Sequence, residues 1–334
     1  MTNALLDEPI QIIKAYIASG VFPGASFAFI NKEKISKYTF GQDRLKPEVV
    51  NLKPDMAYDL ASVSKVVGTG TVLINLILSG KIRLDARLID YYPEFVGKGA
   101  ETLTIRQLVT HTSGIDPFIK NRNALSYSEL RTALNRVDAS LDKVFHYSDV
   151  NFILLGFMLE TMYQKDLAAI LQDQVFKPFN MTHTGFTAPE NTVSTAWDLP
   201  KGVVHDPKAR VLGNHTGSAG LFSTLDDLVQ FSKAYFADDR YLALLKDYSL
   251  TQAMRSISWD ILKGDEANKR DVTSQWLLHT GYTGTFMMLN LKTQQAVIFL
   301  SNRVHLKDDR PGWIIDRNIL IDSFVKAMET LENR

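Results

Sequence analysis

Two residues in the first quarter of the chain have the types and the spacing that covalent catalysis requires. Ser62 and Lys65 stand three positions apart in the run LASVSKVV, and on a helix this spacing brings both side chains to one face within mutual reach. A serine hydroxyl becomes a strong nucleophile when a neighbouring base takes its proton, and a lysine can be that base where desolvation or nearby positive charge lowers its pKa. The pair therefore predicts a nucleophile, Ser62, and its base partner, Lys65.

The stretch that begins at Ser62 supplies suitable surroundings. Residues 62–78 are apolar nearly all round and stop at Gly80, which is typical of a buried helix ended by a glycine in the left-handed conformation. A lysine at the start of such a helix is costly to bury without partners, and the N–H groups of the helix start would help to stabilise an oxyanion beside Ser62. The simpler alternative is a helix-capping serine followed by a lysine that extends its amine to solvent.

Strand-like runs lie near both ends of the chain. SFAFIN and KISKYTFG follow a helix predicted at 10–18, and SQWLLHT, TFMMLNL and QQAVIFLSN precede a last amphipathic helix at 313–328. Strands from the two ends can share one antiparallel sheet, with the first and last helices packed on its face.

Helical signals dominate between the two sets of strands. Capping-box spacing pairs Thr104 with Gln107 and Ser126 with Glu129, and helical periodicity marks 150–163 and 225–236. The middle of the chain is therefore expected to be mainly α-helical.

Together these elements predict an α/β fold, with an antiparallel sheet from both chain ends flanked by helices and an inserted, mainly helical lobe. We expect a single domain, 1–334, whose sheet lobe is 1–61 plus 255–334 and whose helical lobe is 62–254. No internal repeat or long linker interrupts the sequence, so we expect the site to lie in a cleft between the lobes.

Composition limits the classes of partner. Lys plus Arg equals Asp plus Glu, at 37 each, so the chain lacks the excess positive charge on which binding to nucleic acids relies.

The chain has no cysteine, which excludes disulfides and thiolate chemistry and agrees with a reducing compartment. Its start, MTNALLDEPI, is unlike a secretory signal, and no apolar run reaches the roughly 20 residues that span a bilayer. We expect a cytoplasmic protein with a small-molecule substrate; the oligomeric state stays open.

Several ordered motifs resemble the serine β-lactamase and penicillin-binding-protein superfamily, and within it the class C β-lactamase, DD-carboxypeptidase and esterase branch. Besides SVSK at 62–65, these motifs are TIRQLVTHTSGI at 104–115, FHYSDVNFILLG at 145–156, PFNMTHTGF at 178–186, VHDPKARVLGNHTGSAGLFSTLDDL at 204–228 and HTGYTG at 279–284. The resemblance covers nearly the whole chain. It implies a β-lactamase-like (DD-peptidase) fold and acyl transfer through a covalent intermediate on Ser62.

By this resemblance, Tyr147 is the tyrosine of the second motif, whose phenol moves the proton toward the leaving group. The alternative for Tyr147 is a core tyrosine with a satisfied hydroxyl. Asp149 stands where that motif usually has asparagine, and an ionised carboxylate accepts hydrogen bonds but cannot donate them. Asp149 is expected either to pair with Lys65 and raise its pKa, which leaves more of the base role to Tyr147, or to be a structural carboxylate.

The third motif, usually Lys-Thr-Gly, reads His279-Thr280-Gly281. Strand geometry is expected to aim His279 and Gly281 to one side and to turn the backbone N–H of Tyr282 toward the cleft, as a second oxyanion donor beside Ser62. Because histidine titrates near neutrality, a grip of His279 on a substrate carboxylate would weaken as the pH rises. The alternative is a histidine that only packs.

We therefore expect a serine hydrolase that acts on an ester, lactam or amide, most of all a carboxylesterase or a weakly β-lactamase-like enzyme. The alternatives are a D-amino-acid peptidase of DD-carboxypeptidase or D-aminopeptidase type, and a slowly acylating penicillin-binding sensor domain.

The expected site has two groups of residues. The catalytic residues are Ser62, Lys65 and Tyr147, and the substrate-binding residues are Asp149, His279, Thr280, Gly281 and Tyr282. The histidine spacings predict no metal, and no cofactor is expected. Ser218, in TGSAG, lacks the first glycine of a nucleophile elbow and is rejected as a rival nucleophile.

Overall fold

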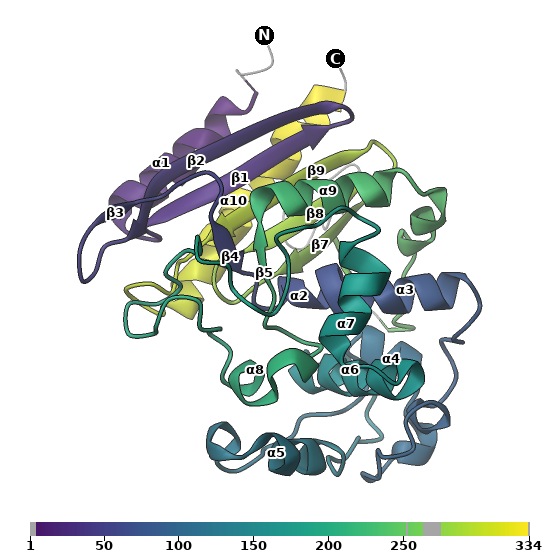
Figure 1. Ribbon diagram of the computed structural model, residues 1–334. Coiled ribbons are helices and arrows are strands. Elements are labelled where there is room, and N and C mark those ends of the chain that lie inside the picture. The colour runs from purple at the N-terminus through teal and green to yellow at the C-terminus, as the bar shows by residue number, and fades with distance from the viewer. Residues whose placement is uncertain (1–4, 252, 263–274, 333–334) are drawn as a thin grey trace.

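A seven-stranded antiparallel sheet forms the centre of the computed structural model, which describes residues 5–251, 253–262 and 275–332 (Figure 1). The strand order is β3 (Val50–Asn51), β2 (Lys34–Arg44), β1 (Gly24–Asn31), β9 (Gln295–Ser301), β8 (Phe286–Asn290), β7 (Trp276–Thr280) and β6 (Asp260–Leu262). Strands β1 and β9 pair side by side, with Ser26 opposite Leu300. The sheet shared by the two chain ends is thus confirmed, although Ser274 of the predicted run lies outside the described residues.

Two helices from the chain ends cover one face of this sheet. Helix α1 (Asp7–Ser19) packs against α10 (Arg310–Glu332), and both run along the sheet in Figure 1. The core beneath them is rich in aromatic rings, because alternate residues of β1, β8 and β9 point to this side. Its members include Phe22, Phe27, Phe286, Phe299, Trp313 and Phe324.

The other face of the sheet carries the helical part of the chain. Helix α9 (Leu225–Phe236) contacts β1 and β9. Beyond it lie α4 (Ile105–Val109), α5 (Tyr127–Leu134), α6 (Asp149–Tyr163), α7 (Leu167–Leu171), η5 (Gln172–Phe176) and α8 (Pro207–Leu212). Short helical turns are η2 (Leu88–Asp90), η3 (Ala100–Thr102), η4 (Arg122–Ala124), η6 (Gly213–His215) and η7 (Asp239–Leu244).

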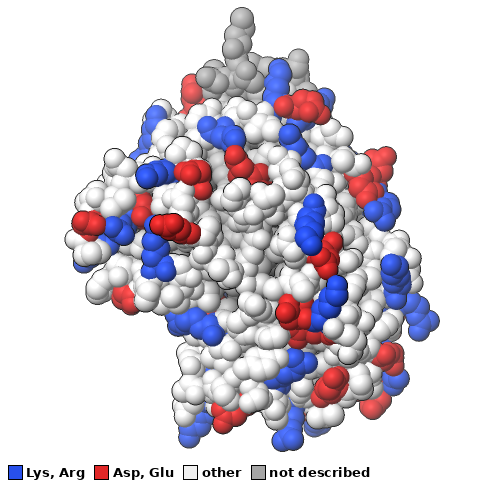
Figure 2. All heavy atoms as spheres, viewed as in Figure 1, with Lys and Arg blue, Asp and Glu red and all other residues white. Residues whose placement is uncertain are grey.

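The predicted helix signals are present in this part. Thr104 and Ser126 are the N-caps of α4 and α5, and each forms the expected capping box with Gln107 or Glu129. No helix in the described part of the chain has both the length and the apolar character needed to cross a bilayer. Acidic and basic side chains are interspersed over the face shown in Figure 2.

The apolar stretch after Ser62 is a continuous buried helical run, but it is not uniformly α-helical. It consists of α2 (Val63–Lys65), a π-helical turn η1 (Val66–Gly70) and α3 (Thr71–Leu78), and Gly80 follows with the left-handed φ of 73°. A Cβ at Gly68 would lie 2.8 Å from a methyl of Leu171. The small residues of η1 therefore allow neighbouring chains to approach closely, and π turns are frequent at functional sites.

A short two-stranded ribbon lies outside the main sheet. Strands β4 (Ala57–Asp59) and β5 (Phe222–Thr224) pair antiparallel, with Asp59 opposite Phe222. Strands of three residues are too short to show a period of two, so the sequence patterns did not indicate them. The ribbon joins the segment that leads into Ser62 to the segment that follows TGSAG.

The aromatic core under α10 generates a stability prediction. Phe299 is fully buried, and its ring lies 5.0 Å from that of Phe286 and 5.5 Å from that of Phe22, measured between centroids. Phe299→Ala should lower the free energy of unfolding by about 3–5 kcal/mol in urea titrations, because it leaves a cavity between sheet and helices. Ile315→Ala, at a side chain that is 64% exposed on α10, is the control and should change it by less than about 0.5 kcal/mol. Equal effects of the two substitutions would contradict this packing.

Candidate active site

The turn before Ser62 is held by a buried carboxylate. Strand β4 ends at Asp59, whose Oδ1 accepts the N–H of Ala61 at 2.9 Å and whose Oδ2 accepts the N–H of His205 at 2.7 Å. Ala61 has a φ of 45°, a left-handed conformation that costs energy for a residue other than glycine. The hydrogen bonds to Asp59 offset this cost. They also fix the position at which Ser62 enters helix α2.

Asp59 is 2% exposed, and its ionisation reflects this. Burial raises the pKa of the Asp59 carboxyl to about 6, against the hydrogen bonds from His205 and Ala61, which act in the opposite direction. The folded protein therefore resists ionisation of this group, whose ordinary pKa is 3.8. The stability of the turn before Ser62 therefore depends on the protonation state of Asp59 and so on pH.

The side chain of Lys65 is fully buried and is saturated with hydrogen bonds. Its Nζ donates to Ser62 Oγ at 3.0 Å, to Asp149 Oδ1 at 2.8 Å and to the carbonyl oxygen of Ser218 at 2.9 Å. Burial opposes its charge, but Asp149 and Tyr147 outweigh burial and raise the pKa of Lys65 above its ordinary value. In this state Lys65 is an ammonium group whose three protons all have acceptors.

Asp149, the first residue of α6, is held by two lysines. Its Oδ1 accepts from Lys65, and its Oδ2 lies 3.0 Å from Nζ of Lys208, which is also 3.0 Å from Oδ2 of Asp206. Burial alone would raise the pKa of the Asp149 carboxyl, but the two lysines outweigh it and hold this pKa well below its usual range. The expected pairing of Asp149 with Lys65 is thus present. The sequence alone did not indicate Lys208, because no motif or spacing rule links it to Asp149.

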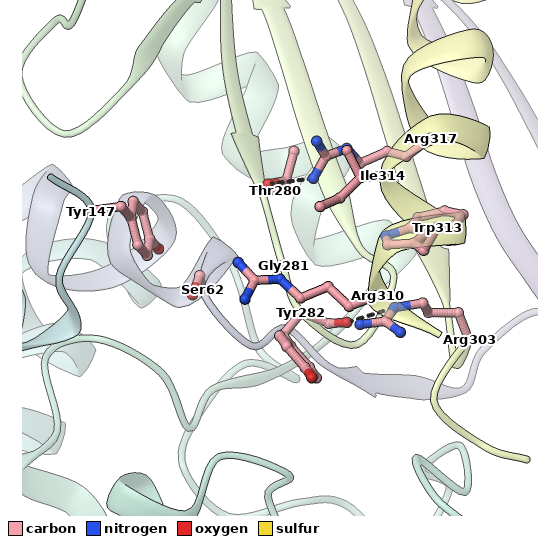
Figure 3. A pocket seen from close by; sticks show the side chains of 10 residues that line it. All are labelled: Ser62, Tyr147, Thr280, Gly281, Tyr282, Arg303, Arg310, Trp313, Ile314 and Arg317. Carbon is pink, nitrogen blue, oxygen red and sulfur yellow. Dashed lines mark hydrogen bonds between the residues drawn. The ribbon is translucent and has the colours of Figure 1, made fainter. Parts of the chain in front are cut away.

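Tyr147 lies on the opposite side of Ser62 from the arginines of α10 (Figure 3). Its ring is 41% exposed and stacks on the imidazole of His111, with 4.4 Å between centroids and an interplanar angle of 24°. Lys65 Nζ lies 5.0 Å from the centre of the phenol ring. This places a cation next to the tyrosine, where it attracts negative charge that develops on the phenol oxygen.

His111 supports Tyr147 from the interior. Its Nδ1 lies 3.0 Å from Nδ2 of Asn151 and accepts the N–H of Ser148 at 3.3 Å. With Nδ1 an acceptor, the proton of the neutral ring is on Nε2. Burial, with Arg255 and Lys65 nearby, lowers the pKa of His111 well below its ordinary value, so the ring is a neutral stacking platform. His111, from the motif TIRQLVTHTSGI, is therefore a structural residue that supports the ring of Tyr147.

The third motif lies at the end of β7, where Thr280 faces the cavity beside Ser62. His279 faces the other side of the strand, toward Tyr147: the two ring centroids lie 6.4 Å apart, the residue is 2% exposed, and its Nδ1 lies 3.2 Å from the carbonyl oxygen of Thr280. Burial, with Lys65 and Arg255 nearby, lowers the pKa of His279 well below 6.5. The ring is therefore neutral around pH 7, and a role of His279 beside Tyr147 in substrate binding stays a prediction.

The turn after β7 lies very close to the turn before Ser62. A Cβ on Gly281 would lie 2.5 Å from the carbonyl oxygen of Leu60, so only glycine allows β7 to approach the Ser62 turn so closely. Tyr282 follows, with its side chain lining the cavity. Within the described part of the chain, the backbone N–H groups of Ser62 and Tyr282 donate to no protein acceptor. Two unused donors flanking a serine are what an oxyanion hole needs.

Arginines border the same cavity. A pocket of about 170 Å³ is lined by Ser62, Tyr147, Thr280, Gly281, Tyr282, Arg303, Arg310, Trp313, Ile314 and Arg317 (Figure 3). Arg303 has a structural role. Its Nε donates to the carbonyl oxygen of Tyr282 at 2.9 Å and its Nη1 donates to Asp308 at 2.7 Å. Arg317 Nη1 lies 3.3 Å from Oγ1 of Thr280, and Arg310 extends its guanidinium toward Ser62 in Figure 3. The sequence alone did not indicate Arg310 and Arg317, because α10 carries no motif, nor Arg303, which precedes this helix.

Ser218 is fully buried, and it is the carbonyl of this residue that contacts Lys65, so its hydroxyl has no access to a substrate. Among the residues that the structure describes, no group of three or more histidines and carboxylates has the arrangement of a metal site.

Comparisons with known proteins agree on the fold and on the type of chemistry. A family model described as Beta-lactamase matches residues 10–320. A putative D-alanyl-D-alanine carboxypeptidase of Salmonella agona (strain SL483) is 25% identical over 323 residues, which span 81% of this chain and 74% of that protein. A second, from Salmonella schwarzengrund (strain CVM19633), is 26% identical over 330 residues, spanning 78% of this chain and 76% of its own length.

Solved structures resemble the fold over nearly the whole chain. "EstCE1, a hydrolase with promiscuous acyltransferase activity" superposes with a TM-score of 0.78 at 16% identity, covering 96% of this chain and 99% of its own. A class C beta-lactamase in complex with cefoxitin has a TM-score of 0.76 at 18% identity, covering 98% and 99%. The predicted β-lactamase-like fold is thereby confirmed.

The buried carboxylate of Asp59 leads to a prediction about pH. Its pKa is about 6 in the folded protein and near 3.8 when exposed, so between these values the unfolded chain loses its proton first and the folded state loses stability as the pH rises. Asp59→Asn cannot ionise and lacks this contribution. The free energy of unfolding of the variant minus that of the parent should therefore increase by roughly 1–3 kcal/mol between pH 4 and pH 7, measured by urea titration. A difference that is constant over this range would show that Asp59 titrates normally.

Proposed function

Since the chain belongs to the Beta-lactamase family and is a serine hydrolase of it, we propose that it cleaves a small ester, lactam or amide through an acyl-enzyme on Ser62. The observation that carries this proposal is the contact of 3.0 Å between Lys65 Nζ and Ser62 Oγ, at the wall of a cavity that Tyr147 also lines. A nucleophile, a cationic partner and a phenol thus meet at one accessible point.

In the proposed reaction, Tyr147 and Lys65 act as a coupled pair that shares protons. The resting Lys65 is an ammonium group, so its Nζ has no lone pair with which to accept a proton. The pair must therefore lose one proton before it can accept the proton of Ser62 Oγ. Attack of Oγ then forms a bond to the substrate carbonyl carbon. The bond between this carbon and the leaving oxygen or nitrogen breaks as the pair passes its proton to the leaving atom. Water hydrolyses the acyl-enzyme by the reverse sequence.

The developing oxyanion is proposed to bind between the backbone N–H groups of Ser62 and Tyr282. The Ser62 turn is fixed by Asp59, and the Tyr282 turn is fixed by Arg303, so the two donors are preorganised. Their separation depends on the close approach of Gly281 to Leu60, which sets the distance between the two turns.

Esters are the leading substrate class. The ionised Asp149 accepts hydrogen bonds and cannot donate, which removes a donor that could recognise the carbonyl of an amide on the acyl side of a peptide or β-lactam. A simple acyl ester needs no such donor. We therefore infer that carboxylesterase activity, with weak β-lactamase activity at most, fits the site best.

A second candidate is favoured by the arginines. Arg310 and Arg317, with the hydroxyl of Thr280, offer donors on the leaving-group side of Ser62 that suit a carboxylate. A peptide that ends in a D-amino acid carries its carboxylate on that side. A D-amino-acid peptidase is therefore the alternative, and slow acylation without turnover would instead indicate a sensor.

The nucleophile is tested by Ser62→Ala. The variant should lose hydrolysis of a short-chain aryl ester by about 10³-fold or more and should gain no mass from an acylating fluorophosphonate in intact-protein mass spectrometry. Ser128→Ala, at an exposed serine of α5, is the control and should behave like the parent. Undiminished hydrolysis, or an adduct in Ser62→Ala, would assign the chemistry to another residue.

The arginine assignment is tested by Arg310→Ala. Removing a charged hydrogen-bond donor should raise KM for a peptide ending in D-Ala-D-Ala by about 10- to 100-fold, while KM for an uncharged aryl ester changes little. Arg240→Ala, on the exposed turn η7 where Arg240 pairs with Asp238, is the control. Equal changes for both substrates would exclude a carboxylate contact at Arg310.

A further inference from the structure

Lys208 occupies an unexpected place for a cation. It comes from α8, a helix 59 positions after Asp149 along the chain, and its Nζ lies 3.0 Å from Asp149 Oδ2 on the side opposite Lys65. The side chain is 12% exposed, yet it lines a cavity of about 490 Å³ that also includes Ser62, Tyr147 and Asp149. Lys208 is therefore part of the wall of the reaction site and is not buried in the core.

The consequence for Lys65 follows from charge. A carboxylate at 2.8 Å from an ammonium holds the proton of that ammonium strongly, and the more so where water is excluded. Asp149 alone would therefore oppose the loss of a proton from the pair of Lys65 and Tyr147, which the proposed reaction requires. A second cation on the other oxygen of Asp149 neutralises the carboxylate and repels the proton on Lys65.

We propose that Lys208 is a positioning residue of this site, which balances the charge of Asp149 and so leaves the Lys65 and Tyr147 pair able to take the proton of Ser62. The inference rests on the proposed function, because it concerns the proton transfer that arms Ser62. Lys208 acts through Asp149 and needs no contact with the substrate.

The remaining charged and titratable groups around this pair do not supply the same balance. Facing it are Asp206 from the start of α8, His205 before it, Tyr282 after β7, Arg122 from η4 and Arg310 from α10, with His111, His279 and Arg255 on the interior side. Asp206 anchors Lys208 at 3.0 Å. Contacts with Asp149 and Asp206 outweigh burial and raise the pKa of Lys208, so Lys208 keeps its charge around neutral pH.

The test compares Lys208→Met, Lys208→Arg, Asp149→Asn and the double variant Asp149→Asn/Lys208→Met. For each, the rate of Ser62 acylation by an aryl ester is measured from pH 5.5 to 10. Lys208→Met should move the rising limb of the profile upward by about one pH unit, equivalent to a tenfold loss at a fixed pH on that limb. Lys208→Arg, which keeps the charge, should restore most of the parent profile.

The double variant separates charge balance from a general disturbance. With asparagine at 149 there is no carboxylate to neutralise, so loss of Lys208 should shift the limb by less than half as much as in the parent. Should Lys208→Met fail to fold by circular dichroism, Lys208→Gln takes its place with the same expectation. A uniform loss of rate at every pH, or an equal shift in both backgrounds, would overturn the proposal.

A measurement without turnover distinguishes this inference from the proposed function. NMR titration of ¹³C-labelled lysines, with Lys65 assigned through Lys65→Arg, reports the pKa of Lys65 in the parent and in Lys208→Met. A higher pKa of Lys65 in Lys208→Met supports the charge balance even if the parent hydrolyses none of the substrates. An unchanged pKa of Lys65 contradicts the balance even if the parent is an active esterase.

Discussion

The structure depends on one buried cation. The ammonium of Lys65 has no access to water, and transferring such a group from water to the interior costs several kcal/mol even after relaxation, unless it is paired and hydrogen-bonded. Its three acceptors come from three separate parts of the chain: the helix start at Ser62, the helix α6 at Asp149 and the carbonyl of Ser218 before β5. The requirement to satisfy one charge therefore determines where three distant segments meet.

The same requirement explains the architecture around the site. The ribbon of β4 and β5 holds the approach to Ser62 beside the segment that carries Ser218, and the close packing of η1 brings the helix run against its neighbours. On the other side, the turn after β7 approaches so closely that a Cβ on Gly281 would lie 2.5 Å from the carbonyl oxygen of Leu60. The main sheet, joined by β1 and β9 from the two chain ends, is the rigid support on which these turns are placed.

The sequence predicted the sheet and the buried helix well, because each leaves a local pattern. Ordered motifs likewise indicated Ser62, Lys65 and Tyr147, which the structure brings together, while their catalytic roles stay a prediction. The sequence failed where geometry depends on a partner far along the chain. The contact of Lys208 with Asp149 has no spacing rule, since α6 and α8 are brought together only by the fold. The arginines of α10 were missed because an amphipathic pattern does not indicate which polar residue faces a cavity.

The ion pair between Asp149 and Lys208 has a consequence for how this site can change over generations. Exchange of either residue alone leaves the other with a second partner, because Asp149 also contacts Lys65 and Lys208 also contacts Asp206. The four charges alternate in sign along one chain of contacts, from Lys65 through Asp149 and Lys208 to Asp206. A change at one of the two positions, 59 residues apart, therefore alters the effect of a change at the other.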